Sequence, residues 1–384
     1  MTLDIPAPGG SPPVSAHRDL HSEQGARLGE HPGRARGPVV KVVDLAWLVF
    51  EKPDLGRAET FARDFGFAVA SRTPDELRLR GTWAGTDALV IRRGRRSRFV
   101  GSVFRAADRS DLNRLARHAG VGVRPLRPGS PGSIVDVVDP TGISVSVVHG
   151  AETHQTLPDQ RPLPVNTGAA APRINAGQRP AREPARVQRL GHVVLQTPRF
   201  LAALDWYLET LGLIVSDFLF LPGQRDRGPT MAFLRCDRGS VATDHHTLAM
   251  HLGPERGYVH SAYQVTDLDA LAAGGEYLAE RGYHRAWGIG RHIQGSQLFD
   301  YWRDPDRLMV EHFADGDLFD ASLEPGWAPM SGSGLAQWGP SVTRDFLGAT
   351  PSPARLRAVV EALRGENTEL TAGRLLNLLK AMAR

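Results

Sequence analysis

One succession of strands and helices recurs along this chain, in two regions that we place at residues 39–150 and 187–316. In the second region, an apolar strand over 187–198 leads into a helix over 199–212, which ends at a glycine, and three short strands follow. The succession then restarts with a strand and a helix that begins at Asp267. The spacing of the apolar residues indicates each element. The sequence therefore predicts an α+β fold built from strand–helix–strand–strand–strand (βαβββ) units.

The two regions also match each other segment by segment. The run DLAWLVFEKPDLGRAETFARDFGF in the first region parallels RLGHVVLQTPRFLAALDWYLETLGL in the second, and VVDPTGISVSVV parallels YWRDPDRLMVEHF. In this superposition Trp47 stands where the second copy has His192. Ser146 stands where the second copy has Glu311. We expect the first copy to keep the fold, to pack against the second, and to lack the residues that carry its chemistry.

Three other segments flank these regions. Residues 1–38 are rich in Pro, Gly, Ser and Arg without periodicity, which is typical of a disordered tail. Residues 151–186 form a Pro/Ala/Arg-rich linker. Residues 317–384 begin irregularly and end in an amphipathic helical pattern. We expect this C-terminal extension to pack on a partner subunit or on its own domain.

Composition excludes several classes of protein. The single Cys236 excludes an intrachain disulfide, a four-cysteine zinc site and a self-sufficient iron–sulfur cluster. No apolar run approaches the roughly 18 residues that span a bilayer, and the N-terminus does not have the pattern of a secretory signal. The net charge of +4 is modest, and the Arg-rich run at 92–98 has no interleaved aromatic residues for stacking on bases. We expect a cytoplasmic protein without nucleic-acid or membrane partners.

Residues 290–317 concentrate reactive side chains in one short segment. A strand carrying Tyr301, a turn at Asp304-Pro305 and a second strand carrying Glu311 predict a β-hairpin. This hairpin would project a phenol and a carboxylate into the same cleft, near His292. The segment is therefore a candidate for one half of a metal site.

Two more histidines complete the candidate metal site. His192 and His260 stand near the starts of two other apolar strands. Two histidines and one carboxylate from separate strands form the facial triad of non-haem iron(II) oxygenases, which leaves positions open on the metal. We choose Glu311 as the carboxylate because it lies in an apolar strand, where an unpaired charge would be costly to bury. The neighbouring His312 should face the opposite side of the strand.

The second region resembles the type I extradiol ring-cleavage dioxygenases of the vicinal oxygen chelate superfamily. The matching segments, in order, are GHVVLQT, DHHTLAM, YVHSAYQV, GRHIQGSQLFDYW and VEHFADGD. The resemblance covers residues 39–316 as architecture and 187–317 as motifs. It implies four βαβββ modules paired into two domains, of which the C-terminal one holds Fe(II).

The resemblance also implies roles for single residues. His192, His260 and Glu311 would bind the metal. His246, rather than its neighbour His245, would be an acid–base group that lies near the metal without binding it.

Further residues would contact the substrate. His292 and Tyr301 would hydrogen-bond a phenolic oxygen, and Phe299, Trp302 and Gln294 would line the substrate pocket. Other branches of the family often have a Thr-Asn-Asp-like run where this chain has Ile293-Gln294-Gly295. This departure leaves the choice of substrate open.

The expected function is that of an Fe(II)-dependent dioxygenase that inserts both atoms of O2 into a catechol and opens the ring beside its two hydroxyls. Mn(II) suits the same ligands, and the family habit suggests a homo-oligomer. Two alternatives stay open. One is a metal-dependent isomerase or lyase of the glyoxalase kind, against which the absence of His or Glu at Trp47 and Ser146 counts. The other is a non-catalytic small-molecule-binding protein, against which the complete triad counts.

Overall fold

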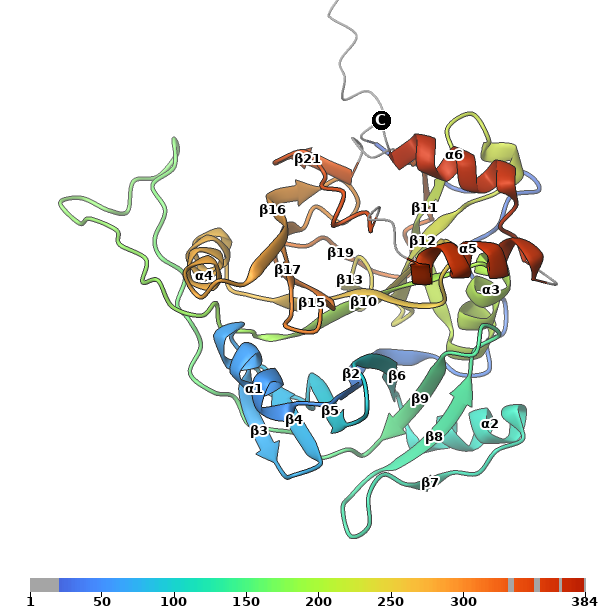
Figure 1. The fold of residues 1–384 in the computed structure, drawn as a ribbon, viewed down its shortest axis with the longest axis horizontal. Helices are drawn as coiled ribbons and strands as arrows, with labels where there is room; N and C mark the ends of the chain where they lie inside the picture. The colour runs from blue at the N-terminus through green and yellow to red at the C-terminus, as the bar shows by residue number, and fades with distance from the viewer. Residues whose placement is uncertain (1–20, 331–334, 349–352, 366–367, 383–384) are drawn as a thin grey trace, which may run out of the picture.

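The computed structural model describes residues 21–330, 335–348, 353–365 and 368–382. Two large β-sheets dominate the molecule, and helices cover their outer faces (Figure 1). Each sheet contains two βαβββ modules, so the predicted α+β fold of four modules in two domains is confirmed.

The first domain contains the first two modules. Its elements are β2 (Val42–Lys52), α1 (Leu55–Asp64), β3 (Ala68–Arg72), β4 (Glu76–Arg80), β5 (Leu89–Arg93), β6 (Arg98–Ala106), α2 (Arg109–Ala119), β7 (Arg124–Pro125), β8 (Ser133–Val138) and β9 (Ser144–His149). The strand order is β3-β4-β5-β2-β6-β9-β8-β7, so the modules join where β2 pairs with β6.

The second domain repeats this arrangement. Its modules contain β10 (Arg189–Thr197), α3 (Phe200–Leu211), β11 (Leu213–Phe220), a 3-10 turn (Arg225–Arg227), β12 (Met231–Cys236), β13 (Thr243–Asp244), β14 (Leu248–Leu252), β15 (Gly257–Gln264), α4 (Leu268–Glu280), β16 (His284–His292), β17 (Leu298–Arg303) and β18 (Met309–Ala314). In the sheet, β14, β10, β15, β18, β17 and β16 are successive neighbours. As expected, α4 starts at Asp267, which is its N-cap: the Asp267 side chain accepts a hydrogen bond from the backbone N–H of Ala270.

Strand register supports the superposition of the two domains. Val193 lies opposite Leu248, and Leu48 lies opposite Leu89, so the preceding residues His192 and Trp47 are equivalent. The partners of β18 and β9 make Glu311 and Ser146 equivalent in the same way.

The register adds one equivalence that the sequence comparison did not provide. His260 pairs with Met309 and Gly101 pairs with Ser144, so Gly101 occupies the position of His260 in the first domain. A Cβ atom at Gly101 would lie 2.2 Å from the backbone oxygen of Ser144. The backbone there has no room for a side chain.

The first domain holds the β17–β18 hairpin of the second. The Lys52 ammonium group, at the end of β2, forms buried ion pairs with Asp304 and Asp306 in the hairpin turn. On β18, the His312 Nε2–H donates to the backbone oxygen of Phe65 at 2.8 Å, and the two rings stack with centroids 3.7 Å apart. The domains therefore meet directly behind the strand that carries Glu311.

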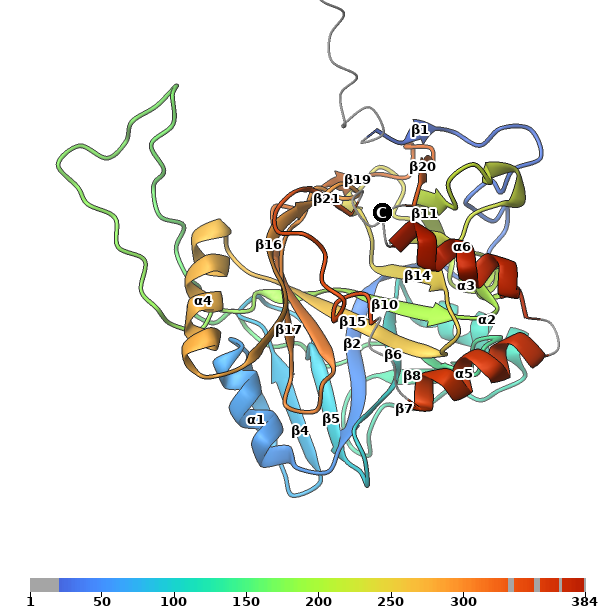
Figure 2. The same cartoon turned by 45° about the horizontal axis from the view of Figure 1, so that its top comes forward.

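The described part of the N-terminal segment corrects one prediction. Residues 21–38 are not a disordered tail, because β1 (Glu23–Gln24) pairs with β20 (Gly326–Pro329), which in turn lies parallel to β11. Residues 1–20 lie outside the described part of the chain. Residues 151–186 form no named helix or strand. The ends of this segment pack on the body, where His154 forms an isolated bridge with Gly85 and Ala185 is buried, and the part between them extends as a long loop in both views (Figures 1 and 2).

The C-terminal extension is more regular than its sequence suggested. It adds β19 (Leu318–Phe319), β20 and β21 (Ala336–Trp338) to the second domain. The amphipathic pattern forms two helices, α5 (Pro353–Arg364) and α6 (Ala372–Met382), which lie over the β11 and α3 side of that domain (Figure 2). Among the described helices, none is both long and apolar enough to span a membrane.

Candidate metal centre

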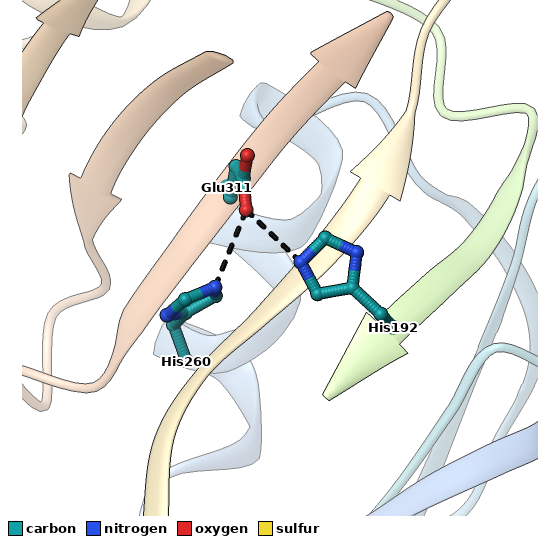
Figure 3. A group of neighbouring side chains, drawn as sticks. All are labelled: His192, His260 and Glu311. Carbon is teal, nitrogen blue, oxygen red and sulfur yellow. Dashed lines mark ion pairs between the residues drawn. The ribbon is translucent and has the colours of Figure 1, made fainter. Parts of the chain in front are cut away.

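Three neighbouring strands bring His192, His260 and Glu311 together (Figure 3). His192 lies on β10, His260 on β15 and Glu311 on β18, and β15 is hydrogen-bonded to both of the other strands. The Nε2 atoms of both histidines lie 3.3 Å from Oε2 of Glu311. One ligand atom from each residue falls within 4.8 Å of the others, so a single ion could contact all three.

The burial of this cluster calls for a cation. Glu311 is 0 % exposed, and within the described residues neither of its carboxylate oxygens has a hydrogen-bond donor. The Nδ1 atoms of His192 and His260 have no partner there either. Burying an uncompensated carboxylate is costly, and a divalent ion would offset that cost. The donor set therefore fits a metal of the kind that two imidazoles and one carboxylate bind.

The electrostatics of the cluster favour the protonation states that a metal requires. Burial acts to raise the pKa of Glu311, but the nearby imidazoles of His192 and His260 outweigh it, so the pKa is lowered overall. Burial also lowers the pKa of His260, against the opposing effect of Glu311. An ionised carboxylate and a neutral imidazole are the ligand forms.

His246 lies beside the cluster, and His245 faces away from it. The ring centroids of His246 and His192 are 3.9 Å apart, and His246 is 4 % exposed. Burial, followed by the neighbouring histidines, holds the pKa of His246 well below its usual value. His245 instead directs its Nε2 atom to Asp217, at 2.7 Å.

Tyr301 and His292 form one side of the site. Tyr301 lies directly opposite Glu311 in the β17–β18 ladder, and its ring centroid is 5.1 Å from that of His260. The Tyr301 hydroxyl lies 2.8 Å from Nε2 of His292, whose Nδ1 lies 2.8 Å from the backbone oxygen of Leu335. Because that carbonyl can only accept, Nδ1 carries the hydrogen and Nε2 accepts from Tyr301. Burial lowers the pKa of His292 to about 4 and raises that of Tyr301 well above its usual value.

The three predicted substrate contacts lie in three different places. Phe299 lies on the same face of β17 as Tyr301, with its ring centroid 4.2 Å from that of His292. Trp302 faces the other side of β17, because neighbouring strand residues alternate, and its indole N–H donates to Asp300 at 2.9 Å. The prediction that Trp302 contacts the substrate does not fit this position. Gln294 lines a separate cavity of about 480 Å³, beside His245 rather than the triad.

The sequence interpretation missed two features of the site. The C-terminal extension covers one side of it, because Phe346 packs on Tyr301 with ring centroids 4.8 Å apart. The irregular sequence before α5 gave no signal for this contact. Asp217 was also missed, although a lone carboxylate in the apolar strand LIVSDFLF is a signal that could have found it.

Comparison with known proteins places this geometry in a family. The Glyoxalase/Bleomycin resistance protein/Dioxygenase superfamily matches residues 189–312. The chain is 32% identical over 340 residues to metapyrocatechase 2 of Cupriavidus necator, which covers 86% of this chain and 98% of that relative. The chain belongs to the extradiol ring-cleavage dioxygenases. As an extradiol dioxygenase it is an enzyme, so the predicted family and enzyme class are confirmed.

This extradiol dioxygenase also resembles one more distant dioxygenase in sequence and two solved structures in fold. Biphenyl-2,3-diol 1,2-dioxygenase of Metapseudomonas furukawaii is 24% identical over 312 residues, covering 78% of this chain and 90% of that one. A Mn(II)-bound glyoxalase from Novosphingobium aromaticivorans has a similar structure, with a TM-score of 0.66, 20% identity and coverage of 87% and 99%. A variant of homoprotocatechuate 2,3-dioxygenase from B. fuscum gives a TM-score of 0.65 at 16% identity, with coverage of 82% and 84%. At these identities the two structures show the shared fold alone.

Proposed function

We propose that this extradiol dioxygenase uses Fe(II) to insert both atoms of O2 into a catechol, opening the ring beside the two hydroxyls. The observation that carries the proposal is the buried, uncompensated Glu311 carboxylate, which faces Nε2 of both His192 and His260. When bound by these three residues, Fe(II) would supply the redox chemistry that lets a catechol react with O2. Mn(II) suits the same ligand set.

Tyr301 and His292 would hold a catechol oxygen. The Tyr301 phenol keeps its proton, since burial and then Glu311 raise its pKa. Nε2 of His292 accepts a hydrogen bond, because burial keeps this imidazole neutral with a pKa of about 4. Because Tyr301 donates its hydrogen to Nε2 of His292, the pair offers the lone pairs of the Tyr301 oxygen, which can accept from a substrate hydroxyl. Phe299 packs against His292 and would exclude water on this side.

His246 would take and return a proton during the reaction. It lies against His192 without belonging to the ligand cluster, and burial keeps its imidazole neutral. A neutral, buried imidazole can accept a proton from a catechol hydroxyl and later donate it to an oxygen atom of the reacting O2. The acid–base role therefore belongs to His246 and not to His245.

The test is reconstitution of the purified protein with Fe(II) under anaerobic conditions, followed by a panel of catechols and air. We expect the protein to consume O2 and to form a yellow ring-opened product in equal molar amounts. His192→Ala and Glu311→Gln should lose bound iron and activity together. His246→Phe should keep its iron and turn over about 100-fold more slowly.

Ser146→Ala is the matched control, because Ser146 occupies the position of Glu311 in the first domain and should leave activity unchanged. Normal iron binding without O2 uptake on any catechol would overturn the dioxygenase proposal and favour an isomerase. The predictions of a homo-oligomer and of a cytoplasmic location stay predictions, and light scattering on the purified protein tests the first.

A further inference from the structure

A buried chain of polar contacts leads away from His246. Nδ1 of His246 lies 3.0 Å from Nδ1 of His245, and Nε2 of His245 lies 2.7 Å from Oδ2 of Asp217. The three residues are 4 %, 1 % and 8 % exposed, respectively. Asp217 comes from β11, at an irregularity in its pairing with β12, whereas both histidines precede β14. Two segments that are separate in sequence therefore converge at His246.

The donor and the acceptor of each hydrogen bond in this chain can be assigned. A carboxylate only accepts hydrogen bonds, so Nε2 of His245 carries the hydrogen toward Asp217. In a neutral His245 ring, Nδ1 is then the acceptor, and Nδ1 of His246 must donate to it. Nε2 of His246 is left as the nitrogen with a free lone pair.

We propose that Asp217 and His245 are positioning residues that fix the tautomer and the ring orientation of His246, so that its Nε2 atom is the one available to the reaction. The proposal rests on the function proposed for His246. An aspartate that orients a histidine through its ring N–H has the same effect in the Ser-His-Asp triad, where loss of the carboxylate charge gives the wrong tautomer.

Neighbouring residues hold Asp217 and His245 in place. Ser22 donates to Oδ1 of Asp217 at 2.5 Å, and Ser216 donates to the backbone oxygen of His245 at 2.5 Å. A Cβ atom at Gly326 would lie 2.1 Å from Oδ1 of Asp217, so only glycine leaves room for this carboxylate. The N-terminal segment and β20 therefore both take part in placing Asp217.

The run Ile293-Gln294-Gly295 lies next to His245. Gly295 has a φ of 80°, and a Cβ atom there would lie 3.0 Å from the His245 ring. Both Gln294 and Gly295 line the cavity of about 480 Å³ that borders Asp217 and His245. This run, in which the chain departs from other branches of the family, thus packs on His245 rather than on the triad.

Asp217→Asn tests the proposal with little change in shape. Because Ser22 donates at the Oδ1 position of Asp217, the asparagine carbonyl takes that place and its amide N–H faces Nε2 of His245. The His245 hydrogen then moves to Nδ1, which forces Nδ1 of His246 to accept. Long-range 1H–15N NMR of histidine-labelled protein, metal-free and loaded with Zn(II), reports the tautomer directly. We expect Nδ1–H at His246 in the natural protein and Nε2–H in the variant.

Kinetics of the iron-loaded enzyme provide a second readout. Asp217→Asn should lower kcat at least about 10-fold, with unchanged iron content and a nearly unchanged KM for the catechol. Asp136→Asn, at an exposed position in the first domain, is the matched control and should behave as the natural protein. If Asp217→Asn does not fold, His245→Gln replaces it, because the glutamine oxygen can still accept from His246 and should retain more activity than His245→Leu.

The outcomes separate the two proposals. An Nε2–H tautomer of His246 in the natural protein, or an unchanged Nδ1–H tautomer in Asp217→Asn, overturns the positioning roles. Equal activity of His245→Gln and His245→Leu overturns them as well. Absence of O2 uptake by the natural protein would overturn the proposed function, while the NMR result would still decide how His246 is held.

Discussion

At the scale of single residues, Asp300 is a fully buried carboxylate that is paired with one arginine. It is 0 % exposed and lies on the face of β17 opposite to Tyr301. Its Oδ2 atom accepts from Trp302 at 2.9 Å and from Arg285 at 3.2 Å. Its Oδ1 atom lies 3.1 Å from Nε of Arg285 as an ion pair, without a well-aligned hydrogen bond within the described residues. Burial raises its pKa to about 7, although Arg285 and Trp302 act in the opposite direction.

This raised pKa predicts a pH-dependent stability. Asp300 is protonated in both states below its usual pKa of 3.8. Between that value and about 7, only the unfolded chain loses the proton, so the free energy of unfolding falls as the pH rises. The loss is roughly 1.4 kcal/mol for each unit of difference between the folded and unfolded pKa values.

Urea unfolding at several pH values between 5 and 8 measures this effect. Asp300→Asn should remove most of the decline in stability across this window. An equally steep decline in the variant would show that another group is responsible.

The proximity of the three expected metal ligands was predictable from the sequence. His192, His260 and Glu311 could be placed together because each stands in an apolar strand of a repeated module. Tyr301 and Trp302 could not both face the site, since neighbouring strand residues point to opposite sides. Asp217 could not be linked to His246 from the sequence, because Asp217 lies in β11 and His246 lies in the segment before β14, and their separation depends on the fold of the whole sheet.

At the scale of elements, the β17–β18 hairpin depends on a cation from the other domain. Lys52 is 4 % exposed and pairs with Asp304 and with Asp306, the latter at 2.8 Å. These carboxylates lie in the turn that precedes the strand of Glu311. Removing one partner of a buried ion pair leaves an uncompensated charge, which is strongly destabilising.

We predict that Lys52→Met lowers the free energy of unfolding by about 3–5 kcal/mol. Lys41→Met is the matched control, because the Lys41–Asp237 pair is partly exposed and should contribute under about 1 kcal/mol. Urea unfolding followed by circular dichroism compares the two variants. Equal effects of the two substitutions would contradict a special role of the hairpin anchor.

The helix α3 shows what the sequence cannot reveal about an element. Its first residue follows Arg199, which provides no side-chain cap. The backbone N–H groups of Leu201 and Ala202 donate instead to Glu369, from the segment between α5 and α6. A cap that comes from so far along the chain leaves no local sequence signal, whereas the Asp267 cap of α4 was predictable.

At the scale of the whole molecule, one apolar core joins the two domains. It includes Phe65 and Phe104 of the first domain together with Tyr263 and Trp302 of the second. Cys236, the only cysteine of the chain, lies in this core and is 3 % exposed. Burial raises the pKa of its thiol to about 12.

We predict that Cys236 reacts with a thiol reagent at pH 8 only when the core opens. Thiolate is the reactive form, and burial suppresses both its formation and its access to reagent. Labelling measured against urea concentration should therefore follow the loss of circular dichroism. Rapid labelling of the folded protein would show that the second domain opens locally.

The repeated modules made the overall fold predictable, since the same pattern of apolar residues occurs four times. The contributions of the flanking segments were not predictable in the same way. Residues 21–38 and the strands β19, β20 and β21 have little periodicity of their own, and they are ordered by pairing with strands that are distant in sequence.

Gly101 limits how the first domain could acquire a metal site. A histidine there would force β9 away from β6, because even its first side-chain carbon would meet the Ser144 backbone at 2.2 Å. Restoring a three-residue metal cluster to the first domain would thus require a shift of the main chain before any substitution became useful. Single substitutions in the first domain therefore cannot readily turn it into a second metal site.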